Sequence, residues 1–378
     1  MASKIILHIG LQKSGTTYLQ EVLGTCTAGL AEAGVLYPLA AEAPRPGAVE
    51  NHEHAMYGLL GTEFPWVGED RAAELREGWE RLSARIRAWP GTVLLSAEAL
   101  AVIRTPAIRR LLDVLDCPDL DVLVTARSLG RSLPSLWQQH IRNGRAGTFE
   151  DYLQVLAEQR DRPNDDIEQV LELHLWRAFA LGGLVRRWAA EAGTGRVRVV
   201  TNAGSPPQLL WSRFSQAIGM LDFAGRPSAD VLGKRTHAGL TAEETILLGS
   251  LNYALSQANW SREEAARVRD TVVNDGFLTR VERGPRNVIP EAWRSRVLQW
   301  GESDVLDLLG SGVGLVGDVE DLRYEPCREL QEPPTARDVS KASAVAVLAV
   351  AEAFKQTPAP PEPPAAQHRP RRLFRTSV

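Results

Sequence analysis

The chain is poor in the features that mark several protein classes. Its 378 residues include only three cysteines, Cys26, Cys117 and Cys327, and no two of them form a CxxC pair. A disulfide scaffold or a zinc ribbon is therefore not expected. No uninterrupted apolar run reaches the roughly 18 residues that a membrane span requires. Because no secretory signal precedes the first glycine, the expected compartment is the cytoplasm.

An excess of positive charge is also lacking. The chain has 43 lysines and arginines against 47 aspartates and glutamates, for a formal net charge of −4. This balance argues against a nucleic-acid partner recognised through bulk positive charge, and it leaves room for a local anion site. Hydrophobic residues make up 44% and charged residues 24%, as in ordinary globular proteins.

Short β-rich runs alternate with helical patterns along the chain. Buried strands are predicted at residues 4–9, 35–38, 92–95, 121–126 and 197–201. This alternation predicts an α/β fold, a three-layer sandwich whose central parallel sheet is covered by helices on both faces. The sequence also predicts a helix-rich C-terminal part.

The composition changes near Glu332. An Ala/Val segment, which predicts a short helix ending near Phe354, is followed by prolines and then by arginines. We therefore divide the chain into a domain at residues 1–330 and an Ala/Pro/Arg-rich tail at residues 331–378, which we expect to be partly disordered.

A glycine-containing loop joins the first strand to the first helix and resembles a phosphate-binding loop. Such a loop offers backbone amides and the positive end of a helix dipole to an anion. Against the pattern G-x-x-x-x-G-K-[ST], Gly10, Gly15 and Thr17 fit, but Thr16 stands in the lysine position. The lysine lies earlier, at Lys13, on the arriving side of the loop.

Residues 7–17 resemble the 5′-phosphosulfate loop of sulfotransferases that use 3′-phosphoadenylyl sulfate (PAPS), a family that commonly has proline where this chain has Gln12. The resemblance implies that Lys13 holds the oxygen bridging phosphate and sulfate and offsets charge there as the bond breaks. It also implies that four loop residues bind the 5′-phosphate: the side chains of Thr16 and Thr17 and the backbone amides of Ser14 and Gly15.

A second anion site is predicted after the strand at residues 121–126. The family binds the 3′-phosphate with an arginine at a strand end and a serine eight positions later, and here Arg127 and Ser135 match that spacing. We expect a helix from about Leu133, with Ser135 in its first turn just after Pro134. The resemblance covers roughly residues 4–325. Some family members carry a later basic element near the 3′-phosphate, which this chain lacks. The basic loop at residues 233–237 is either a substitute for that element or a solvated connector.

Two residues compete for the role of general base. Glu98 follows the strand at residues 92–95, and it can alternatively be a first-turn carboxylate of a helix capped by Ser96. His52 lies in the stretch between the second and third strands, and His54 gives it His-x-His spacing. Without a third ligand at a recognisable spacing, no metal site is predicted.

The resemblance implies that residues 1–330 form a sulfotransferase domain. Its reaction would be in-line transfer of a sulfuryl group from PAPS, without a metal, to a hydroxyl or amine of a carbohydrate, glycolipid or small metabolite. The alternative is a P-loop small-molecule kinase using ATP and magnesium, which predicts a lysine at position 16 and a metal-binding aspartate. A protein that binds nucleotides without catalysis would not need Lys13.

Overall fold

A computed structural model describes residues 2–39, 52–223, 225–233, 239–326 and 332–356. It contains a six-stranded sheet in the order β2-β3-β1-β4-β5-β6, in which every neighbouring pair is parallel. The strands are β1 (Lys4–Gly10), β2 (Val35–Leu36), β3 (Thr92–Ser96), β4 (Leu120–Ala126), β5 (Val197–Thr201) and β6 (Gly314–Val316). The predicted α/β class is therefore confirmed, and β6, a short edge strand, is an addition that the sequence pattern does not predict.

Helices make up most of the remaining structure. Those in the first part of the chain are α1 (Thr16–Thr25), α2 (Thr27–Glu32), α3 (Glu53–Leu60), α4 (Glu69–Ala88), α5 (Thr105–Leu115), α6 (Leu129–Arg142), α7 (Phe149–Arg160), α8 (Asn164–Gln169), α9 (His174–Arg177) and α10 (Leu181–Ala192). Those that follow are α11 (Pro207–Ala217), α12 (Ala229–Gly233), α13 (Ala242–Gln257), α14 (Arg262–Asp270), α15 (Arg294–Gly310) and α16 (Ala336–Gln356). Among the short helices, η2 (Glu98–Val102) and the π-helix η5 (Thr271–Gly276) matter below.

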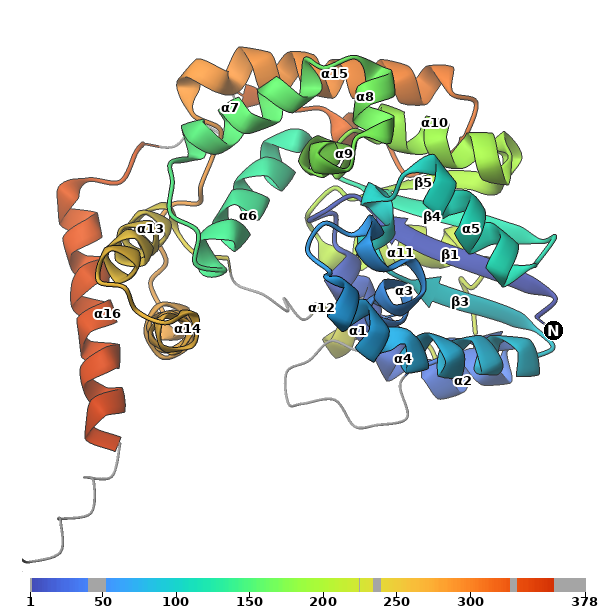
Figure 1. Cartoon of the computed structure of the whole chain (residues 1–378), viewed down its shortest axis with the longest axis horizontal. Helices are drawn as coiled ribbons and strands as arrows, with labels where there is room; N and C mark the ends of the chain where they lie inside the picture. The colour runs from blue at the N-terminus through green and yellow to red at the C-terminus, as the bar shows by residue number, and fades with distance from the viewer. Residues whose placement is uncertain (1, 40–51, 224, 234–238, 327–331, 357–378) are drawn as a thin grey trace, which may run out of the picture.

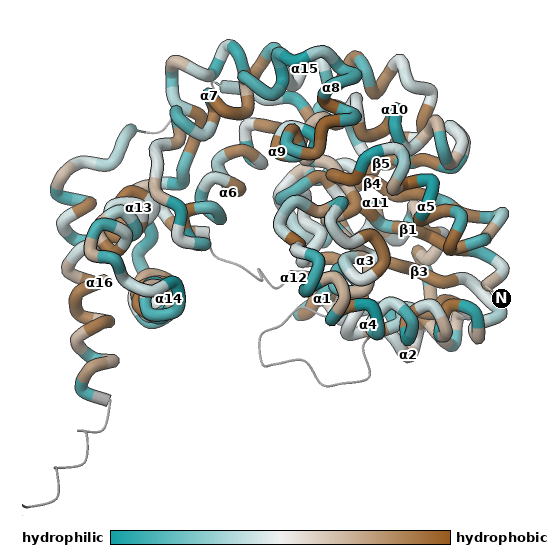
Figure 2. Tube along the Cα trace, viewed as in Figure 1, coloured by the Kyte–Doolittle hydropathy of each residue, from teal (hydrophilic) through white to brown (hydrophobic). Residues whose placement is uncertain are grey.

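The two faces of the sheet are covered by different helices (Figure 1). Successive side chains of a strand point to opposite faces, so Ile5 and Leu7 pack with α3, α4, α5 and α10, whereas Ile6 packs with α1, α2 and α11. Figure 2 shows the hydrophobic strands enclosed between these helices. Burial of both faces explains why the strands are almost continuously apolar.

The sheet topology brings four connecting segments together at the carboxyl ends of the strands, here called the carboxyl edge of the sheet. β1 lies between β3 and β4, and Gly10, its last residue, pairs with Thr125 of β4. Because parallel strands end at the same edge, the segments that follow β1, β3, β4 and β5 meet there. The predicted loop, Glu98 and Arg127 all belong to these segments.

The first helical stretch consists of two helices. α1 ends at Thr25 and α2 begins at Thr27. The Cys26 amide donates to the Leu23 carbonyl at 3.2 Å, a three-residue spacing that tightens and ends the turn.

The C-terminal part forms a helical unit that lies apart from the sheet in Figure 1 and contains α13, α14 and α16. α16 buries Ala342, Ala346 and Ala349 against α13 and η5. A Cβ at Gly276 would lie 3.2 Å from the Ala349 Cβ, so small residues allow this close approach. The predicted short helix thus spans residues 336–356. The division at residue 330 stays a prediction, and residues 357–378 lie outside the described part.

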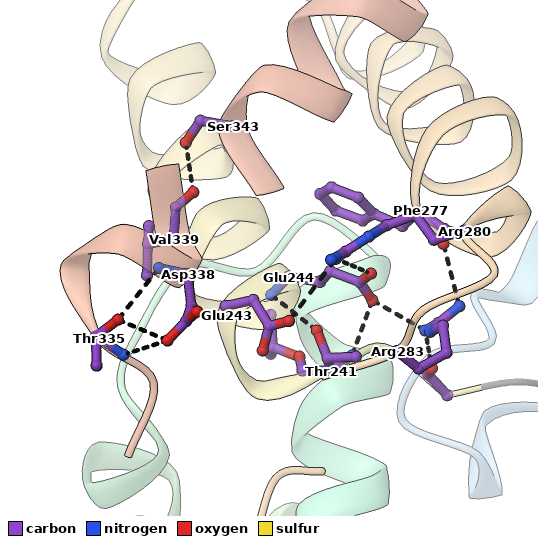
Figure 3. Close-up of polar contacts among 12 residues, drawn as sticks. Thr241, Glu243, Glu244, Phe277, Arg280, Arg283, Thr335, Asp338, Val339 and Ser343 are labelled. Carbon is purple, nitrogen blue, oxygen red and sulfur yellow. Dashed lines mark hydrogen bonds and ion pairs between the residues drawn. The ribbon is translucent and has the colours of Figure 1, made fainter. Parts of the chain in front are cut away.

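A buried acidic residue organises the start of α13 (Figure 3). Glu244 is fully buried, and its carboxylate accepts hydrogen bonds from Arg280 at 2.9 Å and Arg283 at 3.0 Å. It also accepts from the Thr241 amide at 2.8 Å in a capping box. The chain that follows η5 is thereby tied to α13.

None of the helices in the described ranges is both long and apolar enough to cross a membrane.

Candidate functional site

Two glycines shape the loop between β1 and α1. Gly15 has φ 105°, and a Cβ there would lie 2.8 Å from the Asn202 side-chain nitrogen. A Cβ at Gly10 would lie 2.5 Å from the Thr125 hydroxyl oxygen. Lys13 also adopts a positive φ, 63°, which is uncommon outside glycine. The tight loop curvature therefore depends on both glycines and on a strained lysine backbone.

Contacts from two neighbouring strand ends fix the loop. The Ser14 hydroxyl lies 2.8 Å from that of Thr125, and the Asn202 side-chain amide donates to the Ser14 carbonyl at 2.6 Å. The Ser14 amide donates to the Leu11 carbonyl at 3.1 Å, so it serves the turn itself rather than an incoming anion. The first amides of α1, by contrast, have no partner within their own helix.

A buried network of polar side chains lies next to the loop and links the elements around it. The His8 ring nitrogens lie 2.8 Å from the Ser96 hydroxyl and 3.2 Å from the Thr125 hydroxyl, and Gln20 donates to Ser96 at 3.0 Å. Burial lowers the pKa of His8 to about 3, so its imidazole is neutral at pH 7. This network links β1, β3, β4 and α1, and it makes His8 a structural residue.

The charge of Lys13 interacts with groups from other segments of the chain. Burial is the main cause that lowers its pKa, with smaller contributions from Arg142 and Arg127, whereas Glu98 opposes the shift. Charges must be close to influence one another in this way. Lys13 is therefore close enough to Arg127 and to Glu98, which come from two other connecting segments, for their charges to influence its pKa.

Arg127 directly follows β4, as the sequence predicts. A Cβ built at Gly204 would lie 3.4 Å from its guanidinium, which places Arg127 beside the loop that follows β5. Arg131, one turn further along, donates to the Ala203 carbonyl of that loop at 2.7 Å. Two guanidinium groups thus flank the ends of β4 and β5, close to the loop held by Asn202.

The expected position of Ser135 in a first helical turn is wrong. α6 begins at Leu129 rather than Leu133, because the Ser128 carbonyl already accepts the amides of Arg131 at 3.1 Å and Ser132 at 3.0 Å. Pro134 lies inside the helix, where it lacks one backbone hydrogen bond. Ser135 is half-buried and shares a helix face with Arg131, four residues earlier.

Glu98 is the first residue of η2 and bonds to the loop helix. The Thr16 hydroxyl donates to its carboxylate. Burial, and then the charge of Glu53, raise the pKa of Glu98 to about 7, against the Thr16 hydrogen bond and the Lys13 charge. A carboxyl group with this pKa can accept a proton near neutral pH. Ser96, expected as a helix cap, instead lies within β3 and binds His8 and Gln20.

His52 is held on both ring nitrogens. Nδ1 accepts the Ser96 amide at 2.8 Å, and Nε2 lies 3.1 Å from the Pro38 carbonyl, to which it donates. The side chain is buried, and this burial lowers its pKa to about 4. Because Nδ1 already accepts a backbone amide, it is not available to take a proton from an acceptor. The geometry gives His52 a structural role at the end of β3.

The last predicted residue of the loop is Thr17. Thr17 is half-buried in the first turn of α1, next to Thr16. Within the described ranges, no group of three or more His, Cys, Asp or Glu residues is arranged to hold a metal ion. The basic loop at residues 233–237 lies mostly outside the described residues, which end at Gly233 there.

Several site residues are not predicted from the sequence. Thr125 and Asn202 both stand at strand ends, which was a usable signal, because such positions meet at the carboxyl edge. Arg142 lies at the far end of α6, and only the fold brings its charge near Lys13. Glu53 adjoins His52, but its partner Glu98 lies 45 positions away in the chain.

Neither a protein-family model nor a curated protein sequence gives a significant match to the chain. Among solved structures, the chain is similar to a sulfotransferase from Alicyclobacillus acidocaldarius, with 14% sequence identity and a TM-score of 0.43. That similarity covers 82% of this chain and 96% of the other.

Proposed function

We propose that the chain is a sulfotransferase that moves a sulfuryl group from PAPS to a hydroxyl or amine. The observation that carries this proposal is that the loop after β1 contacts the segments of both neighbouring site residues: Thr16 donates to Glu98, and Asn202, from the loop beside Arg127, donates to the Ser14 carbonyl. Lys13 belongs to the same loop, and a cation whose charge interacts with an arginine and with a carboxyl group suits a reaction between an anionic donor and a neutral nucleophile.

The donor would bind along the edge formed by β1, β4 and β5. Thr17 and the first amides of α1 would bind the 5′-phosphate, supported by the helix dipole. Arg127 and Ser135 would bind the 3′-phosphate, with a charged planar fork from the arginine. Arg131 adds a second guanidinium at that edge. Ser14 is left to shape the loop, because its amide and hydroxyl are already bonded.

The chemistry would be an in-line displacement at sulfur. The acceptor oxygen or nitrogen forms a bond to sulfur while the bond from sulfur to the bridging oxygen breaks, and its electron pair leaves with the 5′-phosphate. Glu98 takes the acceptor's proton, for which a pKa of about 7 is well placed. Lys13 neutralises the charge that develops on the bridging oxygen.

The acceptor would be a carbohydrate, a glycolipid or a small metabolite. No step of this scheme uses a metal ion. In the alternative kinase scheme, a lysine would occupy position 16; here Thr16 donates to Glu98, which ties the loop to the proposed base.

A thermal-shift comparison of 3′-phosphoadenosine 5′-phosphate (PAP), AMP, ATP with magnesium, and NAD tests the proposal. A ligand that binds only the native state raises the melting temperature. At a concentration one hundred times its dissociation constant, such a ligand increases the free energy of unfolding by about 2.7 kcal/mol. We expect PAP to give the largest shift, and Arg127→Ala to reduce the PAP shift to that of AMP. Equal shifts from PAP and AMP in the unaltered chain would rule out the second anion site, and a dominant shift from ATP would favour a kinase.

A further inference from the structure

A second carboxylate lies beside Glu98. Glu53, the first residue of α3, accepts the Ala99 amide at 3.2 Å through Oε1 and the Tyr57 hydroxyl at 3.2 Å through Oε2. Ala99 is the residue directly after Glu98. No side chain of η2 or its N-cap residue, Ala97, caps this short helix, so Glu53 supplies a cap from another element.

His52, the residue just before α3, binds the other side of the same turn. The His52 imidazole accepts the Ser96 amide at 2.8 Å, and the His52 amide donates to the Ser96 carbonyl at 3.2 Å. Neighbouring residues at the start of α3 therefore bind the backbone before and after Glu98. This arrangement restricts both the position and the orientation of the Glu98 side chain.

We propose that Glu53 is a positioning residue for Glu98: it holds the turn that carries Glu98 and places a second negative charge beside it. Glu53 itself is not assigned a contact with the substrates. A role for Glu53 in catalysis rests on the proposed function, in which Glu98 is the base. The effect of Glu53 on the position and pKa of Glu98 does not depend on that function.

The other groups around Glu98 act in the opposite direction or are neutral. Lys13 and the Thr16 hydroxyl, from the loop and α1, both favour the ionised carboxylate. His8 in β1 is neutral at pH 7, because burial lowers its pKa to about 3. Tyr57 of α3 also keeps its proton, since burial and the Glu53 charge raise its pKa.

Two arginines donate hydrogen bonds to the backbone carbonyls at the C-terminal end of η2. Arg177 of α9 donates to the Val102 carbonyl at 2.9 Å, and Arg187 of α10 donates to the Ala101 carbonyl at 2.9 Å. Burial lowers the pKa of His174, which is also in α9. Glu53 is thus the charge that, together with burial, disfavours ionisation of Glu98. Two neighbouring carboxyl groups with different environments can divide structural and proton-transfer roles between them.

The test is to titrate the Glu98 carboxyl carbon by NMR in the full chain labelled at glutamate Cδ, with Glu98→Gln used to assign the signal. Glu53→Gln keeps the shape and removes the charge. We expect the Glu98 midpoint near 7 in the unaltered chain, and a midpoint lower by roughly one pH unit in Glu53→Gln. An unchanged midpoint in a folded Glu53→Gln variant would overturn the proposal.

Glu63→Gln is the matched control. Glu63 is buried, whereas Glu53 is half-buried, and like Glu53 it accepts a backbone amide, that of Arg104 at 2.7 Å, but it is not among the charges that influence Glu98. This variant is expected to leave the Glu98 midpoint unchanged. If Glu53→Gln does not fold, Glu53→Asp decides, because it moves the charge away by one methylene: a lowered midpoint supports the proposal and an unchanged one overturns it.

The titration needs neither donor nor acceptor, so it separates this proposal from the proposed function. A lowered Glu98 midpoint in a chain that does not prefer PAP would keep the positioning role and reject the sulfotransferase. A clear PAP preference with an unchanged midpoint would do the reverse. Where both hold, the acidic limb of the pH–rate profile is expected to move with the midpoint in Glu53→Gln, whereas a purely structural role would lower the rate at every pH.

Discussion

At the scale of single residues, the unusual group is Glu98, a half-buried carboxyl whose pKa rises from 4.5 to about 7. Between these values the folded chain keeps a proton that the unfolded chain releases, so the free energy of unfolding falls as pH rises. Above pH 7 the loss in the free energy of unfolding is complete. It amounts to about 3 kcal/mol, because each pH unit between the two pKa values contributes about 1.36 kcal/mol. Glu98 therefore costs stability at the pH where it could work as a base.

Glu98→Gln is accordingly expected to stabilise the chain more at pH 8 than at pH 5. Urea unfolding of both proteins at the two pH values measures this difference. Asp304 has a pKa raised by burial to about 7 as well, but it is present in both proteins and cancels in the comparison. The same stability gain at pH 5 and pH 8 would show that Glu98 titrates normally.

At the scale of elements, the loop and α1 behave as one unit whose shape depends on Gly15. The positive φ of Gly15 and its closeness to Asn202 leave no room for a side chain. Gly15→Ala is expected to cost about 1–3 kcal/mol through backbone strain and to weaken PAP binding.

Gly24 provides the control for this prediction. It lies within α1, and nothing is within 4 Å of a Cβ built there. Gly24→Ala is expected to stabilise the chain by up to about 1 kcal/mol, with PAP binding unchanged. Calorimetric unfolding with and without PAP distinguishes the two variants. If both behaved alike, the loop would not have the close packing described above.

The elements also show what the sequence can and cannot reveal. The predicted strands at residues 197–201 and 121–126 match β5 and β4 closely, because buried parallel strands are continuously apolar. The α6 start was missed, since a proline ordinarily marks a first turn and here lies in the helix interior. Ser135 therefore lies in the second turn of α6, and no local sequence signal marks that position.

At the scale of the whole molecule, the helical unit formed by α13, α14 and α16 depends on Glu244. Removing a buried carboxylate that pairs with two arginines leaves uncompensated charges, so Glu244→Ala is expected to cost about 3–5 kcal/mol. Glu263→Ala, which breaks an exposed pair with Arg267, is expected to cost less than about 1 kcal/mol. Chemical unfolding measures both, and similar losses would contradict the role given to Glu244.

The arrangement of distant segments is the part that the sequence predicts least. The loop at residues 10–17 carries recognisable chemistry, and its neighbour Arg127 follows a clear strand. The sheet order that brings Glu98 and Asn202 to the same edge depends on long-range strand pairing, which local patterns do not encode. Likewise, His52 is a second candidate base in the sequence, and only the fold reveals that both of its ring nitrogens are bonded.

A crystal structure of the chain with bound PAP tests the central claim most directly, because the claim is that two anion sites on one edge hold a single nucleotide. The account predicts the 5′-phosphate at the start of α1 beside Lys13, and the 3′-phosphate within hydrogen-bond distance of Arg127. A nucleotide bound elsewhere, or one whose 3′-phosphate is turned away from Arg127, would contradict it.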